Sequence, residues 1–172
     1  MTRHRYDLRS QASSLRGRGY AHLSSGQLPH MESICVSEVH LEPGGHLPPH
    51  SHPDAGELCY LLSGEISYAL ADPSAQNPHI YLLQPGQAAY APPGWYHWLT
   101  PLTPSTKLLL IYNQDRPHQQ ELLPWRSGEI YPVMEQAANQ AANQTTQLKS
   151  GQNAVSPSPP WLANQRKTTI NR

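Results

Sequence analysis

The chain has 172 residues, in which 12 Lys and Arg are balanced by 12 Asp and Glu. This length fits one domain, and the zero net charge offers no basic excess for contacts with phosphates, which argues against a nucleic-acid partner. No apolar run approaches the roughly 18–20 residues that a membrane-spanning helix needs. The two cysteines, Cys35 and Cys59, are too few for a disulfide scaffold and are interpreted as buried free thiols.

Both ends of the chain have the composition of unstructured segments. Residues 1–18 carry five arginines scattered among polar residues and are expected to form a flexible arm. No apolar stretch follows Met1, so we expect no secretory signal. A cytoplasmic location is therefore expected. Residues 134–172 contain a repeated Gln-Ala-Ala-Asn and a Ser-Pro-rich stretch, which cannot bury enough apolar surface to offset chain entropy. We expect this tail to be disordered.

The segment between these ends, 19–133, is predicted to be a single all-β domain with its core at 30–113. Eighteen prolines, and several glycines between short apolar runs, favour strands joined by turns over helices. In chain order, the expected strands are 19–25, 34–41, 57–63, 65–71, 80–83, 88–91, 96–100 and 107–112. Gly64 predicts a hairpin or a sharp bend between the third and fourth. Short strands at such regular spacing are typical of a sandwich or barrel.

The first candidate site motif combines two histidines and a glutamate. His50 and His52 are two residues apart, so in a strand both imidazoles point the same way. The prolines beside them predict a short strand or an edge strand. Glu57 opens the run 57–64, in which alternation places Glu57, Cys59 and Leu61 on one face. If Glu57 points inward, Cys59 and Leu61 line the interior.

The second motif brings a third histidine. Pro92, Pro93 and Gly94 predict a tight turn that leads into a strand containing His97. Three imidazoles and one carboxylate suit Fe, Mn, Ni, Co or Zn better than they suit a soft metal. An isolated His-x-His is common on polar strands, but both motifs together indicate one divalent metal ion with coordination positions open to a small molecule.

These two segments resemble the two conserved motifs of the cupin superfamily over about residues 30–113. The spacing from the His pair to the glutamate is similar to that of germins and oxalate decarboxylases. The resemblance implies a cupin-type jelly-roll β-barrel and a mononuclear Mn or Fe centre. It also implies a homodimer or a higher oligomer. The ligands that it implies are His50, His52, Glu57 and His97.

Three positions depart from the family pattern. Pro101 stands where the second motif usually has Asn, a residue of the fold rather than a ligand. Leu47 stands where oxalate-handling members tend to have Arg or Asn, which weakens an oxalate assignment. Cys59 stands where cupin lyases that cleave sulfonium propionates often have a tyrosine.

The sequence therefore predicts a metal-dependent oxidoreductase of the dioxygenase type, acting on a small organic acid or enol. Leu47, Leu61 and Trp95 are the expected pocket residues, and Tyr90 or Cys59 is the candidate proton donor. Two alternatives stay open: a small-molecule binding cupin without catalysis, and a lyase or isomerase that uses a redox-inert metal such as Zn. Fold alone does not separate them.

Overall fold

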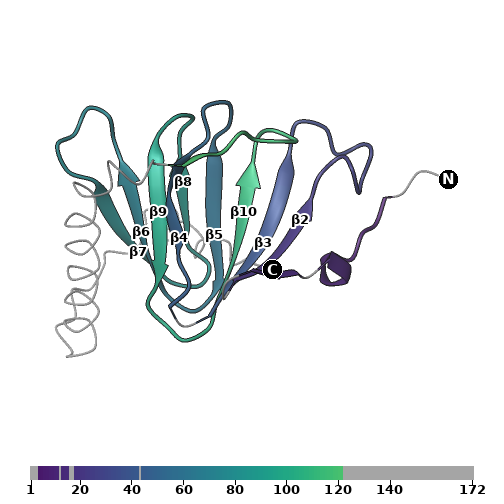
Figure 1. Ribbon diagram of the computed structural model, residues 1–172, viewed down its shortest axis with the longest axis horizontal. Coiled ribbons are helices and arrows are strands. Elements are labelled where there is room, and N and C mark those ends of the chain that lie inside the picture. Colours follow the sequence, from purple (N-terminus) through teal and green to yellow (C-terminus); the bar gives the residue numbers. More distant parts are fainter. Residues whose placement is uncertain (1–3, 12, 16–17, 43, 122–172) are drawn as a thin grey trace, which may run out of the picture. The chain divides into compact units, whose positions relative to one another are not determined.

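Two antiparallel β-sheets account for most of the computed structural model, which describes residues 4–11, 13–15, 18–42 and 44–121. In chain order, the elements are η1 (Leu8–Gln11), β1 (Ser13–Leu15), β2 (Arg18–Leu23), β3 (Cys35–Leu41), β4 (Leu47–Ser51), β5 (Glu57–Ser63), β6 (Ile66–Ala71), β7 (His79–Leu83), β8 (Ala88–Ala91), β9 (Tyr96–Pro101), β10 (Thr106–Tyr112) and β11 (Gln120–Glu121). One sheet has six strands in the order β1-β2-β3-β10-β5-β8, and the other has five in the order β11-β4-β9-β6-β7 (Figure 1). The prediction of an all-β fold of the jelly-roll type is confirmed.

Alternation of side chains builds the interior of the six-stranded sheet. In β3 and β10 every second residue is buried, and in β5 the buried residues are Glu57, Cys59 and Leu61. The inward face predicted for β5 is therefore confirmed. Its apolar members join a core contributed by both sheets, and burial of each large apolar side chain stabilises the fold by about 1.5–3 kcal/mol.

The chain turns sharply between the sheets at Gly64. β5 belongs to the six-stranded sheet and β6 to the five-stranded sheet, so the Ser63–Gly64 junction is a bend and not a hairpin. Gly64 has a φ of 85°, and a Cβ there would lie 2.7 Å from the carbonyl oxygen of Ser105. Only glycine fits this corner without strain.

The ends of the chain are described in part. Within the predicted flexible arm, η1 and β1 are formed, and β1 pairs with β2. Residues 122–133 of the predicted domain and the predicted disordered tail at 134–172 lie outside the described residues. Within the described ranges, no helix has the length and hydropathy to cross a membrane.

Candidate metal centre

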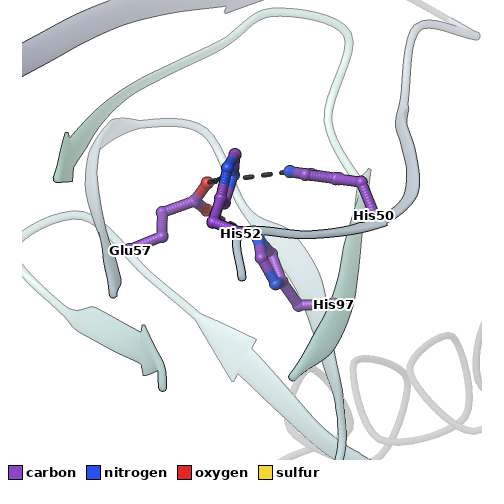
Figure 2. A group of neighbouring side chains, drawn as sticks. All are labelled: His50, His52, Glu57 and His97. Carbon is purple, nitrogen blue, oxygen red and sulfur yellow. Dashed lines mark hydrogen bonds and ion pairs between the residues drawn. The ribbon is translucent and has the colours of Figure 1, made fainter. Parts of the chain in front are cut away.

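Three histidines and one glutamate converge at one point inside the barrel. His50 comes from β4, His52 follows it by two residues, Glu57 begins β5 and His97 lies in β9. One ligand atom from each lies within 4.8 Å of all the others, and Figure 2 shows the four side chains pointing toward one another. All four are buried, with exposed fractions of 1–4%. The sequence-predicted ligand set is therefore assembled by the fold.

A bulge in β4 places His50 directly opposite His97. Leu47 pairs with Leu99 and His50 pairs with His97, so three steps along β4 match two steps along β9. The extra residue falls at Pro48 and Pro49, which have no N–H group to give to a ladder. As a result the two imidazole rings lie next to each other, tilted by 57°, with centroids 4.3 Å apart.

The predicted turn before His97 is also formed. Gly94 has a φ of 80°, and the N–H of Trp95 donates to the carbonyl of Pro92 at 3.1 Å, which is the geometry of a type II turn. The N–H of Gly94 donates to the carbonyl of His52 at 2.8 Å. This bond ties the loop that leads to His97 to the backbone of another candidate ligand.

Backbone carbonyls fix the tautomer of each imidazole. Nδ1 of His50 lies 2.7 Å from the carbonyl oxygen of Pro48, Nδ1 of His52 lies 2.8 Å from that of His118, and Nδ1 of His97 lies 3.0 Å from that of Trp95. Since a carbonyl can only accept, each Nδ1 carries the proton. In the neutral rings each Nε2 therefore presents a lone pair, the arrangement that metal-binding histidines use.

These lone pairs face a carboxylate. Nε2 of His52 and His50 lie 3.2 and 3.7 Å from Oε2 of Glu57, and Nε2 of His97 lies 3.3 Å from Oε1. Burial by itself raises the pKa of Glu57, but hydrogen bonding with the three imidazoles outweighs burial and holds that pKa well below its ordinary value. Such a hydrogen bond needs a proton on Nε2, and a bound cation would take the place of that proton. Glu57 is thus an ionised carboxylate surrounded by nitrogen donors.

The donor set fits a cation. Glu57 Oε1 and His97 Nε2 are buried and have no hydrogen-bond partner among the described residues, and buried polar atoms are rarely left without one. Ligands about 2.1 Å from a common ion lie about 3 Å apart when adjacent, close to the separations found here. A divalent ion would satisfy the orphaned atoms and neutralise the buried charge.

Two tyrosines beside the site were missed by the sequence analysis. Tyr112 in β10 pairs with Glu57, and its ring lies 5.0 Å from that of His52. Tyr68 in β6 stacks on His97 with centroids 6.1 Å apart, and within the described part of the chain its buried hydroxyl has no hydrogen-bond partner. Burial first, and then the charge of Glu57, raises the pKa of both phenols. Both therefore stay neutral and can donate a proton.

The two residues predicted as proton donors occupy different faces. Cys59 is completely buried on the inward face of β5, and burial raises the pKa of its thiol. Tyr90 pairs with Leu58, on the face of the sheet opposite to Glu57, and is 51% exposed. Its phenol packs against Gly56, where a Cβ would meet the ring. A catalytic role for either residue stays a prediction.

A cavity of about 230 Å³ adjoins the site at His50. Leu47, one of the predicted pocket residues, lines it. Leu61 is completely buried in the core cluster, and Trp95 packs against that cluster while its carbonyl orients His97. The described lining residues are Tyr20, Val39, Leu47, His50, Leu110, Tyr112 and Gln119.

The segment 113–119, between β10 and β11, holds several parts of the site in place. Oδ1 of Asn113 accepts the N–H of Gly56 at 2.9 Å. Asp115 accepts both the N–H and the hydroxyl of Ser25. The N–H of His118 donates to Asp54 at 2.9 Å, while its carbonyl accepts Nδ1 of His52. Nothing in the spacing of the sequence signals this role.

Comparison with known proteins decides the family. The family model described as Cupin matches residues 10–158, most of the chain. The chain belongs to the cupin family. The family resemblance predicted from the two motifs is thereby confirmed, and the four ligand candidates of this cupin are the residues that carried it.

Among curated proteins, this cupin is similar to germin-like proteins of plants. It is 37% identical over 68 residues to germin-like protein 3-1 of Oryza sativa subsp. japonica, a match that covers 40% of the chain and 30% of the relative. It is 32% identical over 76 residues to germin-like protein subfamily 3 member 1 of Arabidopsis thaliana, covering 43% of the chain and 36% of the relative. The matches thus span about a third of these relatives.

Among solved structures, the cupin is similar to oxalate decarboxylases. A Bacillus subtilis oxalate decarboxylase, studied for its Mn(II) centres, superposes with a TM-score of 0.64 at 21% identity, over 73% of this chain and 36% of that one. The oxalate decarboxylase of Lactobacillus farciminis, in a formate complex, gives a TM-score of 0.60 at 19% identity, over 66% and 34%. At this identity the likeness establishes the jelly-roll fold alone.

Proposed function

We propose that this cupin is a mononuclear metal-dependent enzyme, an oxidoreductase of the dioxygenase type that acts on a small organic acid or enol. One observation carries the proposal: three imidazoles whose Nδ1 protons are held by carbonyls turn their Nε2 lone pairs onto a buried carboxylate. Such a set needs a cation. Four protein ligands leave a six-coordinate ion two positions for a substrate or O₂.

In this proposal each residue near the site has a defined task. His50, His52, His97 and Glu57 hold the ion, which when bound supplies Lewis acidity and, if redox-active, electron transfer. The single carboxylate leaves a divalent site with one net positive charge, so an anionic oxygen donor is favoured. Tyr112, buried against Glu57 and lining the cavity, is placed to donate a hydrogen bond to a substrate oxygen. The apolar cavity wall excludes water from the reacting atoms.

Mn or Fe is the proposed metal. Nitrogen and carboxylate donors suit these ions, although Zn, Ni and Co accept the same set. The Mn(II) centres named for the Bacillus oxalate decarboxylase support Mn as the first metal to test.

Elemental analysis of freshly purified protein, followed by turnover assays with and without O₂, tests the proposal. About one Mn or Fe per chain, with activity on a small acid or enol that disappears anaerobically, is the expected result. Turnover that persists without O₂ and with Zn would indicate the lyase or isomerase alternative. Ligand binding without turnover would indicate a binding module. A chain that retains no metal would overturn the proposal.

We also propose that the protein works as a homodimer through the outer face of its six-stranded sheet. Tyr60, Leu62 and Tyr90 are exposed there, at 37–51%. Leu109 and Ile111 of β10 pair with Tyr60 and Leu58 and continue the same face, where they are half-buried. A contiguous apolar face of this kind is typical of a protein interface, and twofold symmetry lets one patch bind its own copy.

A further inference from the structure

The cavity beside His50 differs in chemistry from the metal site that it adjoins. Val39 and Leu110 are buried at its wall, with exposed fractions of 1% and 3%, and half-buried Leu47 faces it from β4. Its size lies below the roughly 300–1,000 Å³ of sites for drug-sized ligands. The space therefore suits a small molecule with an apolar portion.

The polar groups on the cavity wall are neutral. Besides His50 they are the phenols of Tyr20 and Tyr112 and the amide of Gln119. Among the described residues that line the cavity there is no Lys or Arg. Phenols and an amide can bind the carbonyl or hydroxyl oxygens of a ligand, but they cannot neutralise a carboxylate.

Charge balance then limits the ligand. A divalent ion with Glu57 as its one anionic protein ligand has one positive charge left over, which a single carboxylate cancels. A second carboxylate, too far from the ion to bind it, would face Leu47, Val39 and Leu110, and the described lining residues offer no cation to pair with it. Burying an unpaired charge against apolar groups is strongly unfavourable.

We propose that the cavity selects monocarboxylates that chelate the metal through a 2-oxo or 2-hydroxy group and carry a short apolar side chain, and that Leu47 is the residue that disfavours dicarboxylates. This inference rests on the proposed function, because the metal must hold the charged end of the ligand. The carboxylate and its neighbouring oxygen bind at the ion, Tyr112 bonds one of these oxygens, and the side chain lies against Leu47, Val39 and Leu110.

Calorimetric titration of the Mn-loaded protein tests this selectivity. The probes are 4-methyl-2-oxopentanoate and two dicarboxylates whose second carboxylate cannot reach the ion, 2-oxoglutarate and 2-hydroxyglutarate, and elemental analysis first establishes the metal content. We expect 4-methyl-2-oxopentanoate to bind about tenfold or more tightly than either dicarboxylate. We expect no binding to the metal-free protein.

Two matched variants test the role of Leu47. Leu47→Arg adds a cation to the cavity wall and is expected to reverse the preference toward the dicarboxylates. Tyr81→Arg adds the same charge at an exposed position on β7, away from the cavity, and is expected to leave the preference unchanged. If Leu47→Arg does not fold, Leu47→Gln takes its place and is expected to weaken binding of 4-methyl-2-oxopentanoate more than that of 2-oxoglutarate. The relative affinities of the wild type for the three probes test the selectivity without any variant.

The outcomes separate this inference from the proposed function. A chain without metal overturns both. A stoichiometrically loaded chain that prefers dicarboxylates, binds all three probes equally or binds none of them overturns the selectivity and leaves the metal site standing. If a folded Leu47→Arg variant still prefers the monocarboxylate to the dicarboxylates, Leu47 is not the residue that disfavours dicarboxylates.

Discussion

The backbone carbonyl of His118 accepts a hydrogen bond from Nδ1 of His52 at 2.8 Å, across 66 residues of sequence. This bond fixes the tautomer and ring orientation of a candidate metal ligand from outside its own strand. His118 is held in turn by Asp54, which accepts its N–H at 2.9 Å and lies 3.4 Å from its Nδ1. The segment 113–119 thus links a loop carboxylate to the metal site.

Asp54→Ala is expected to weaken metal binding without removing a ligand. Losing the carboxylate frees His118, so its carbonyl no longer orients His52. Groups that orient a metal ligand through a hydrogen bond typically contribute 10–100-fold to metal affinity, and we expect a loss in that range. Competition with a coloured chelator measures the dissociation constant.

Asp72→Ala is the matched control for this variant. Asp72 also accepts a backbone N–H, that of Ser74 at 2.8 Å, but it does so in the turn between β6 and β7. We expect its metal affinity to equal that of the wild type. Equal affinities for all three proteins would mean that His118 does not need Asp54 in order to orient His52.

Removing a ligand is expected to abolish metal-dependent stabilisation. In the wild type, metal at 100 times its dissociation constant should stabilise the fold by about 2.7 kcal/mol, because it binds only the native chain. Glu57→Gln keeps the shape of the side chain but removes the charge, and His97→Ala removes a nitrogen donor. We expect neither variant to show a rise in Tm with added metal, while circular dichroism remains that of a β-protein.

His46→Ala controls for the loss of a histidine as such. His46 is exposed and precedes the ligand strand by one residue, so this variant should retain the full metal-induced rise in Tm. If His97→Ala also shows the full metal-induced rise in Tm, the ion binds at another site.

The four ligands could be predicted from the sequence because they obey local rules. A strand places residues two apart on one face, and the Pro-Pro-Gly turn before His97 has its own chemical signature. Tyr112 could not be found in this way, because its place beside Glu57 depends on the pairing of β10 with β5. The bulge at Pro48 and Pro49 likewise depends on the partner strand β9. Pairing between distant strands is set by the packed core, which no short window of sequence contains.

The alternation of inward and outward side chains along a strand is informative only where one face of the strand is buried. It correctly placed Cys59 and Leu61 inward with Glu57, since β5 has one buried face. In β6 five successive residues are buried, so alternation there gives no signal that Tyr68 lies against His97.

Low pH is expected to weaken the hydrogen bonds that Asp115 accepts from Ser25, and with them the stability of the fold. The backbone N–H and the hydroxyl of Ser25 donate to its carboxylate at 2.6 and 2.7 Å, and these bonds lower the pKa of Asp115 below its ordinary value of 3.8. A carboxyl whose pKa is lower in the folded state than in the unfolded chain stabilises the fold at pH values above its ordinary pKa. This contribution is lost as the pH falls below that ordinary pKa. Asp115→Asn should therefore be less stable than the wild type at pH 7.

Urea unfolding at several pH values checks the sign of this effect. The difference in unfolding free energy between wild type and Asp115→Asn should shrink as the pH falls from about 5 to about 2.5. Because all other carboxyls titrate in both proteins, the difference isolates Asp115. A difference that stays constant or grows on acidification would contradict the role given to its charge.

The outer face of the six-stranded sheet supplies the test of the proposed homodimer. Tyr60 lies in β5, the strand next to the edge strand β8, and its exposed ring pairs with Leu109 across the sheet. A twofold interface of standard size buries about 800 Å² per partner, so a charge at such a position on both copies should be costly. We expect Tyr60→Lys to convert a dimer into a monomer in size-exclusion chromatography with light scattering.

Tyr81→Lys makes the comparison specific to that face. Tyr81 is similarly exposed, at 44% against 37% for Tyr60, but it lies on β7 in the five-stranded sheet. The same substitution there should leave the dimer intact, since the charge enters water in both states. If the wild type is monomeric at all concentrations, the proposed dimer is wrong. If Tyr81→Lys dissociates the dimer and Tyr60→Lys does not, the interface lies on the five-stranded sheet instead.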